Sequence, residues 1–391
     1  MRLIKSILSS FKYEIHEIIG DKLYIYIVLA LPISMILFFS IMFYRGDVVG
    51  IPVVVVDRDN SAMSRKIISM IDATPGVDIA FRRENIDSAE QLFLSGDVVG
   101  IIYLDDDFEA NIYREVPVDV ECYLSGTTIS ASGIVERDVQ QAIKTFSAGV
   151  AIQKLEYIGV GYSQVMVDIM PINVQTNIIS NPYLNYGYYL APIFMFMGVV
   201  IFTMLATIYA FGRELRYARC AIWRASGNGS FAAAIIGKLL PITLFMAVVS
   251  QLIYAILFIL MGMECTGSYL LLTLASLLLI FAYQAVAMFI ISLTSNLRLA
   301  LSLGGGYAVM AFTFSGVTFP TMAMFKPLQL LAKLFPLTYF SEVLVDQSMR
   351  GTPFIYDILP MAVLLCFVVL MPLCWRRLKN ITINKKYWGR E

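Results

Sequence analysis

The sequence predicts an α-helical membrane protein with six transmembrane helices and an α/β domain inserted between the first two. Three observations predict it. Of the 391 residues, 58% are hydrophobic and only 15% are charged, whereas soluble proteins carry about 25% charged residues. The charges are unevenly spread, so that six long stretches contain none. Between the first and second of these stretches, short apolar runs alternate with helical patterns.

Each uncharged stretch is long enough to cross a bilayer as a helix. A hydrocarbon core of about 30 Å requires about 20 helical residues. Only helices and closed barrels satisfy their backbone hydrogen bonds in hydrocarbon, and these stretches lack the alternation of barrel strands. We therefore expect transmembrane helices near 23–43, 187–211, 238–262, 269–292, 299–319 and 357–375.

Lysine and arginine residues indicate the orientation, because they accumulate in cytoplasmic loops. They are frequent in the N-terminal segment 1–22, in the loop 212–237 and in the tail 376–391. The loop 263–268 has none, and 320–356 has few. We therefore expect both termini in the cytoplasm, the chain in the inner (cytoplasmic) membrane, and residues 44–186 outside the cell membrane.

The N-terminal segment 1–22 has a helical pattern of its own. It is too charged for the apolar region of a cleavable signal peptide. Its charged residues occupy one face, which predicts a cytoplasmic amphipathic helix lying flat at the membrane surface. His16 is the one histidine of the chain, so no histidine metal cluster or Ser-His-Asp triad is predicted. The apolar face is formed by Ile4, Ile7, Leu8, Phe11, Ile15 and Ile18.

The inserted domain, 44–186, is expected to contain a partly parallel sheet, because its strands alternate with helices. A last extended segment is expected at 165–177. Acidic residues outnumber basic ones about two to one here, which disfavours nucleic acid as a partner. The expected strands are 51–56, 77–81, 98–104 and 117–124, and the expected helices are 60–73, 86–95, 108–114 and 128–160.

Three consecutive aspartates, Asp105, Asp106 and Asp107, precede one of these helices. Carboxylates at this position stabilise a helix N-terminus through its dipole. A calcium loop is the alternative, but the glycine and distal glutamate of an EF-hand are absent. We favour the structural role.

The predicted spans contain no internal Asp, Glu, Lys or Arg, which argues against a transporter driven by an ion gradient. Gln251 and Gln284 are the notable polar side chains. They are expected to form interhelical hydrogen bonds worth about 0.6 kcal/mol, or alternatively to line a substrate path. Gly304, Gly305 and Gly306 permit close helix contact or a hinge.

Two further segments suggest roles beyond connection. The loop 212–237 is longer than a simple connection requires, which suggests docking of a cytoplasmic partner. Residues 315–340 are too interrupted by proline to span and too apolar for an exposed loop. A re-entrant pair of short helices at 320–340, dipping into the outer leaflet, fits this pattern.

Several motifs together resemble the membrane subunits of ATP-binding-cassette exporters, the type-2 permease family with a large outer domain. The resemblance covers nearly the whole chain. Similar proteins have acidic residues before the first span, a Gly-Lys-Leu-Leu-Pro segment entering the third, and a proline-broken segment after the fifth. The matching residues here are Glu14, Glu17 and Asp21; Val56, Asp57, Asp59, Ser61, Ser64 and Arg65; Asn181, Pro182 and Pro192; Gly237 to Pro241; Ser315, Gly316, Phe319 and Pro320; and Phe335 to Tyr339.

The resemblance implies a transport subunit without enzymatic activity. Two permease chains, identical or different, would form a dimer on two cytoplasmic ATPase chains. ATP and Mg would be bound by those partners, because this chain has no Walker motif. Membrane lipid surrounds such proteins, and a periplasmic membrane-fusion adaptor is a further expected partner. One departure is that Arg213-Glu214 is not followed by the acidic-Gly-Thr-Glu motif common in such permeases.

The resemblance also assigns candidate site residues. Those for coupling to the ATPase are Glu14, Asp21, Arg213, Glu214, Arg216, Arg219 and Trp223. Those for the outer gate are Ser315, Gly316, Phe319, Pro320, Pro336 and Tyr339. No catalytic or metal-binding residue is expected, and the cargo is not readable.

Two other classes of protein compete with the exporter. A membrane-anchored receptor or mechanotransmission protein would sense or dock a partner with its outer domain and move nothing. It would normally carry a cytoplasmic output domain, whereas the largest inner segment here is the loop 212–237. A membrane-embedded hydrolase would need an intramembrane acid pair or a histidine cluster, and the sequence offers neither.

The topology is directly testable. A tag at residue 100 should react with membrane-impermeant reagents added from outside the cell, because the inserted domain is expected there. A tag that is shielded from outside and accessible only from the cytosol would contradict the six-span topology.

Overall fold

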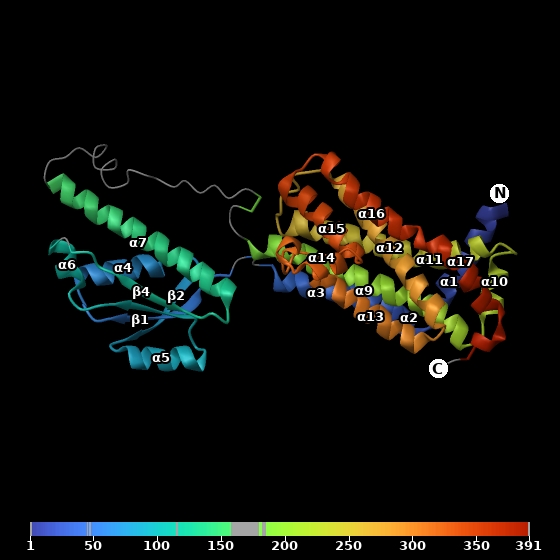
Figure 1. Cartoon of the computed structure of the whole chain (residues 1–391), viewed down its shortest axis with the longest axis horizontal. Helices are drawn as coiled ribbons and strands as arrows, with labels where there is room; N and C mark the ends of the chain where they lie inside the picture. The colour runs from blue at the N-terminus through green and yellow to red at the C-terminus, as the bar shows by residue number, and fades with distance from the viewer. Residues whose placement is uncertain are drawn as a thin grey trace. The chain divides into compact units, whose positions relative to one another are not determined.

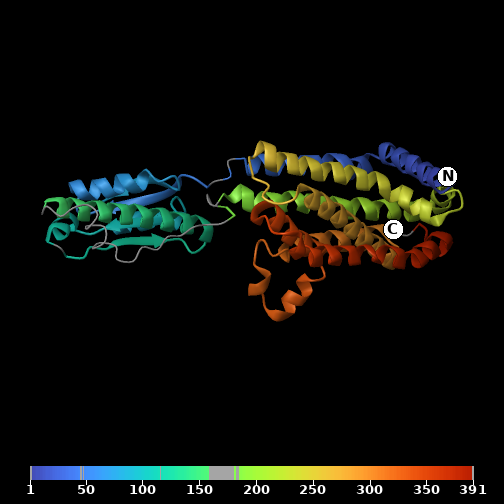
Figure 2. The ribbon, with the colours of Figure 1, turned by 90° about the horizontal axis from the view of Figure 1, so that it is seen from above.

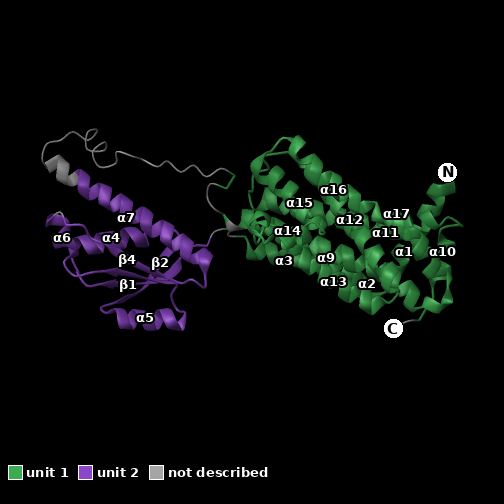
Figure 3. Ribbon diagram, viewed as in Figure 1, with its two compact units in different colours: residues 1–46, 178–391 green, residues 47–177 purple. Residues whose placement is uncertain are grey.

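The computed structural model describes residues 2–44, 46, 48–114, 116–157, 180–181 and 185–389, with the backbone alone for 153–157 and 186. The chain divides into two compact units (Figure 3). One consists of residues 1–46 and 178–391, here called the membrane unit. The other is residues 47–177, here called the outer unit. The sequence placed the inserted domain at 44–186.

The membrane unit is helical throughout. In chain order its elements are α1 (Arg2–Gly20), α2 (Lys22–Ile25), η1 (Tyr26–Ala30), α3 (Leu31–Met42), α9 (Tyr186–Arg216), α10 (Cys220–Ser226), α11 (Phe231–Ala255), η2 (Ile256–Leu260), α12 (Tyr269–Thr294), α13 (Leu297–Thr313), η3 (Thr321–Ala323), α14 (Lys326–Ala332), α15 (Pro336–Val345), η4 (Asp346–Arg350), η5 (Phe354–Tyr356), α16 (Ile358–Val368), α17 (Leu370–Ile383) and η6 (Lys385–Tyr387).

Five helical stretches of the described chain are long and apolar enough to span a membrane, and a bent pair raises the number to six. The predicted fold class, a helical membrane protein with a small inserted sheet, is therefore confirmed. The five spans are Lys22–Met42, Gly187–Arg216, Phe231–Leu260, Tyr269–Thr294 and Ile358–Ile383. Four helices follow a capping residue whose side chain accepts a hydrogen bond from a first-turn N–H. The capping residues are Asn185 for α9, Ser230 for α11, Ser268 for α12 and Asn296 for α13.

The fifth predicted span, 299–319, differs from the structure. The helix α13 ends at Thr313, and the chain turns at Gly316, whose φ of +85° suits glycine. Beyond the turn, α14 and the stretch Pro336–Arg350 form a pair bent by 87°. Figure 2 shows the orange segment around α14 standing away from the other helices of the unit. The predicted pair of short helices is present, but it continues ten residues past 340 to Arg350.

The outer unit contains a four-stranded sheet of order β2-β1-β3-β4. Strand β1 pairs in parallel with β2 and β3, and β4 pairs antiparallel to β3. In Figure 1, α5 lies on one face of the sheet, and α4 and α7 on the other. The elements are β1 (Ile51–Asp57), α4 (Ala62–Asp72), β2 (Val77–Arg83), α5 (Ile86–Ser95), β3 (Gly100–Leu104), α6 (Phe108–Arg114), β4 (Val120–Leu124) and α7 (Ile129–Tyr157).

The continuous apolar run of β1 follows from burial on both faces. Val53 and Val55 pack into the core beneath α4 and α7, whereas Val54 and Val56 pack into the core beneath α5. All four are almost inaccessible to solvent. The predicted strands and helices of this unit correspond to the observed ones, with ends shifted by a few residues. The extended segment predicted at 165–177 lies outside the described residues.

Two of the three aspartates before α6, Asp105 and Asp106, accept contacts outside this helix, and a first-turn N–H of α6 is bound by a residue from another segment. The N–H of Glu109 donates to Asp59, 3.1 Å away. Asp106 pairs with Arg58 at 3.0 Å, and Asp105 accepts from the N–H of Asp106. Within the described chain, no group of three or more His, Cys, Asp or Glu side chains is arranged to hold a metal.

The three consecutive glycines of α13, residues 304–306, allow a test of how this helix packs against α9. A Cβ at Gly304 would overlap Ile208 of α9, whereas one at Gly305 would meet nothing within 4 Å. Ile208 is fully buried, so its side chain cannot move out into solvent. We expect Gly304→Leu to lower the free energy of unfolding by about 1–3 kcal/mol through overpacking, and Gly305→Leu to cause no loss. Thermal unfolding of the purified protein measures both, and equal effects would contradict this packing.

Candidate functional site at the α1 end of the membrane unit

The helix α1 packs along α11 with its polar face inward. Ser6, Ser10, Glu14 and Glu17 are buried, whereas Ile4 of the apolar face is 71% exposed. Figure 2 shows α1, in dark blue, running beside the yellow-green start of α11. The sequence predicted the amphipathic pattern. The structure adds that the polar face contacts protein, whereas Ile4 and Leu8 of the apolar face are exposed.

Gly237 allows this close approach. A Cβ at this position would lie 2.7 Å from the carbonyl oxygen of Ile7 and 2.9 Å from the nitrogen of Phe11. Contacts that short against backbone atoms do not occur without displacement of the helix. Ser10 fixes the register by donating a hydrogen bond of 3.0 Å to the carbonyl oxygen of Ala234. Glycine is therefore required here by the distance between the two helices.

Lys238, the residue that follows Gly237 in α11, is the centre of a buried ion cluster. Its side chain is fully buried, and its ammonium contacts the carboxylates of Glu14 and of Glu214, the latter at 3.1 Å. Tyr24 donates to Glu14 at 2.5 Å, and Tyr13 donates to Glu214 at 3.2 Å. The cluster thus joins α1, α2, α9 and α11.

The second half of the cluster is centred on Glu17. Its carboxylate accepts from Arg213 at 2.8 Å and from Arg219 at 2.8 Å. Arg213 also donates to the carbonyl oxygen of Glu17 at 3.0 Å and lies 3.6 Å from Asp21. Asp21 caps α2 and accepts from Tyr209 at 2.7 Å. Arg219 precedes α10, so this half connects α10 to α1 and α9.

The charges of the cluster do not balance. Four carboxylates (Glu14, Glu17, Asp21 and Glu214) face three cations (Arg213, Arg219 and Lys238). Burial raises the pKa of Glu14 above its usual value, and the nearby ammonium of Lys238 opposes that rise. Hydrogen bonding to Glu17 raises the pKa of Arg219, which stays charged. Isolated charges at these positions would be costly, so each depends on its partners.

The helices that carry two of the predicted spans are longer than predicted and extend past the charges at their ends. Span Phe231–Leu260 begins seven residues before Lys238, and span Gly187–Arg216 includes Arg213 and Glu214. The sequence placed the ends of these helices at the charges, whereas the helices continue past them. This is possible because protein groups surround the charged side chains and replace their hydration.

The other coupling candidates divide into buried and exposed residues. Trp223 is fully buried, and its indole N–H donates to the carbonyl oxygen of Ala234 at 3.2 Å. Arg216 is partly exposed beside Tyr217. The most exposed large side chains near α10 are Tyr217 (54%) and Ile222 (56%). A role of any of these residues in contact with an ATPase stays a prediction.

Sequence reasoning missed Lys238, Tyr13, Tyr24 and Tyr209 as members of the cluster. The sequence did contain a signal for the part of the cluster that lies on α1. Ser6, Ser10, Glu14 and Glu17 recur at intervals of three and four residues, which places them on one helix face. A wholly polar stripe of this kind requires polar partners, and Lys238 at the start of an apolar helix is one.

Some of the predicted outer gate residues are buried or hydrogen-bonded to neighbouring segments, whereas others are exposed. Ser315 is buried, and its carbonyl oxygen accepts from Ser341 at 2.6 Å. Pro336 begins α15 and is buried, and Tyr339 donates to the carbonyl oxygen of Lys333 at 3.2 Å. Phe319, by contrast, is 53% exposed. Pro320, which precedes η3, is exposed too, and Gly316 supplies the turn described above. Their gating role stays a prediction.

Both glutamines bond to a neighbouring helix. Gln284 of α12 donates to the hydroxyl of Thr243 in α11 at 2.9 Å, and Gln251 accepts from Tyr269 at 2.5 Å. Gln284 is fully buried. Their geometry is that of interhelical hydrogen bonds. A place on a substrate path stays a prediction.

The cluster predicts a specific pattern of instability. Lys238→Met leaves Glu14 and Glu214 buried without their cation, so we expect it to lower the free energy of unfolding by about 3–5 kcal/mol. Adding Glu14→Gln should restore part of the loss, because one buried charge is removed. Lys12→Met, at an exposed position of α1, should change stability by less than about 0.5 kcal/mol. Thermal unfolding tests all three variants, and a fully stable Lys238→Met would refute the central role of this residue.

Comparison with known proteins agrees with this architecture. A search of curated proteins found no match. A family model described as "ABC-2 family transporter protein" matches residues 22–373, which is most of the chain. The chain therefore belongs to the ABC-2 transporter family, as a multi-pass membrane permease subunit of an ABC transporter.

Proposed function

We propose that the chain is the permease subunit of an exporter, powered by separate ATPase chains that dock at the α1 end of the membrane unit. ATP and Mg would be bound by those chains. The observation that carries the proposal is the buried ion cluster, because it connects α1 and α10 to two membrane-spanning helices. In Figure 1 both termini, α1 and α10 lie at the same end of the membrane unit.

The cluster supports a route for force from a docked partner to the spans. A push on α10 acts on Arg219, whose guanidinium pairs with Glu17 of α1. Glu17 also pairs with Arg213, inside the span Gly187–Arg216. Buried charged pairs resist separation because each group left alone would be desolvated. Helices α1, α9, α10 and α11 would thus move as one body when the permease changes its packing.

A docking surface for the partner is available on α10 itself. The side of this helix opposite Trp223 presents small and apolar side chains, of which Ile222 is the largest. Exposed apolar groups gathered on a short connection indicate contact with another protein. We define the α10 surface as the exposed residues Ala221, Ile222 and Ala225 of this helix, together with exposed Tyr217 and Ala218 in the turn before it.

The remaining elements of the proposal concern orientation and assembly. Basic residues are concentrated in the segments that form the α1 end, which favours a cytoplasmic location for both termini. The membrane is then the inner (cytoplasmic) one, and the outer unit is extracytoplasmic. We propose a second permease chain as the partner in the membrane, and a periplasmic adaptor as a ligand of the outer unit. The cargo would leave the cytoplasm as the paired permeases alternate between two packings.

Deletion of 213–230 would remove the proposed docking segment, but it would also remove buried Arg213, Glu214 and Trp223. A point variant on the α10 surface tests the docking of the ATPase without that loss. We expect Ile222→Glu to abolish copurification with the ATPase and ATP-driven transport, because it places a charge in an apolar contact. Its melting temperature should stay that of the wild type, since Ile222 is 56% exposed.

The control is Lys12→Glu, which reverses an exposed charge on α1, outside the α10 surface. It should keep both the complex and transport. An intact, active complex with Ile222→Glu would show that the ATPase docks elsewhere. Transport that proceeds inward in vesicles of known orientation would refute export.

A further inference from the structure

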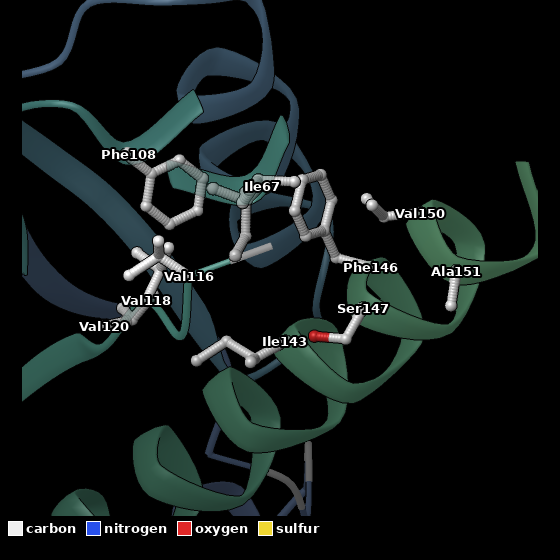
Figure 4. Close-up of a pocket in the computed structure, with 11 residues that line it drawn as sticks. Ile67, Phe108, Val116, Val118, Val120, Ile143, Phe146, Ser147, Val150 and Ala151 are labelled. Atoms are coloured by element: carbon white, nitrogen blue, oxygen red, sulfur yellow. The ribbon is translucent and has the colours of Figure 1, made fainter. Parts of the chain in front are cut away.

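The outer unit contains a pocket that none of the transport steps above uses. It lies between α7, α6, α4 and the chain that leads into β4, and it has a volume of about 240 Å³. Figure 4 shows the rings of Phe108 and Phe146 beside Ile67, with Ile143 and Ser147 of α7 facing the space from another side. Ile67, Phe108 and Phe146 belong to the buried core, whereas Val116 at the rim is 49% exposed. The pocket therefore leads from the surface into the core.

The chemistry of the lining restricts what can occupy it. Of its eleven residues, ten are apolar, and Ser147 alone carries a polar side-chain group. None is ionisable. A peptide segment would bring one N–H and one C=O per residue, and the pocket offers them almost no partners. A charged group would lose its hydration without compensation. The occupant must be a hydrocarbon along its buried length.

The volume restricts the size of the occupant. An apolar cavity of about 150 Å³ holds one benzene molecule, so a pocket of about 240 Å³ holds about ten carbon atoms at the same density. This is the size of one alkyl chain or chain end and too small for two chains of a phospholipid. The rings of Phe108 and Phe146, 6.4 Å apart between centroids, form an aromatic wall of the kind that binds apolar chains.

We propose that this pocket binds the alkyl chain of a free single-chain amphiphile, with the polar end of the ligand left in solvent beyond Val116. The outer unit is joined to the span Lys22–Met42 by residues 43–50, so it is tethered to a bilayer, where such amphiphiles concentrate. The proposal concerns the outer unit alone. It holds whether or not the ligand is exported.

The test uses the full-length protein in lipid nanodiscs and a ten-carbon fatty acid with a terminal diazirine, which inserts into neighbouring bonds on illumination. A parallel sample carries the same diazirine at the end of a phospholipid acyl chain. Mass spectrometry of the digested protein locates the label. We expect the fatty-acid probe to label the wild type within 108–120 and 143–151.

Two variants fill the pocket, and one serves as a matched control. Ala151→Phe and Ser147→Phe each place a ring in the space. Because one ring takes up about 150 Å³ of it, room for only about four carbon atoms of the ligand remains, and labelling there should fall by at least about tenfold. Gln141→Phe adds the same ring at an exposed position of α7 outside the lining and should keep the wild-type labelling. Labelling of the membrane helices should be equal in all four proteins, which shows that the probe reaches each of them to the same extent.

Three outcomes would overturn the proposal. Absence of label within 108–120 and 143–151 of the wild type would show that the pocket does not bind the alkyl chain. Undiminished label in both filled variants would place the probe elsewhere. Labelling of the pocket by the phospholipid probe alone would assign the chain to bilayer lipid.

Discussion

The membrane unit depends on one buried interaction, the ammonium of Lys238 between the carboxylates of Glu14 and Glu214. Each of these charges is out of contact with water, and each would be costly alone. Together they connect the N-terminal helix to two spans, so the position of α1 follows from the requirement that three charges stay in contact. The tyrosines and Trp223 around them supply hydrogen bonds and ring faces that replace water.

The same requirement explains the orientation of α1. An amphipathic helix at a membrane surface usually directs its polar face to water. Here Ser10 and Glu14 contact α11, because Gly237 permits backbone contact and Lys238 supplies a cation, and Glu17 pairs with Arg213 of α9. The apolar residues, Ile4 and Leu8 among them, are left outward, where lipid is the matching solvent. Protein contacts on the polar face and lipid on the apolar face therefore both stabilise the position of α1.

Much of the fold was predictable, whereas the sequence indicated several charged members of the cluster but neither their pairing nor its centre, Lys238. The apolar run of β1 and the turn residues around the strands of the outer unit carry strong local signals, and these elements were predicted to within a few residues. The helix ends were misplaced at Arg213 and Lys238, because a charge in an apolar stretch was interpreted as the end of the membrane. Only the pairing of residues more than two hundred positions apart, such as Glu14 with Lys238, shows that these charges are enclosed by protein. Hydropathy along one chain does not contain that information.

The short helix α13 has a consequence for the surrounding lipid. Its 17 residues rise about 25 Å, less than the hydrocarbon thickness of about 30 Å. The chain beyond it remains apolar and presents Met322 and Phe325, 88% and 74% exposed. Either the bilayer thins beside α13 or this following segment lies within it, and both cost free energy in proportion to the mismatch in length. The acyl-chain length of the host membrane thus enters the energetics of this side of the permease.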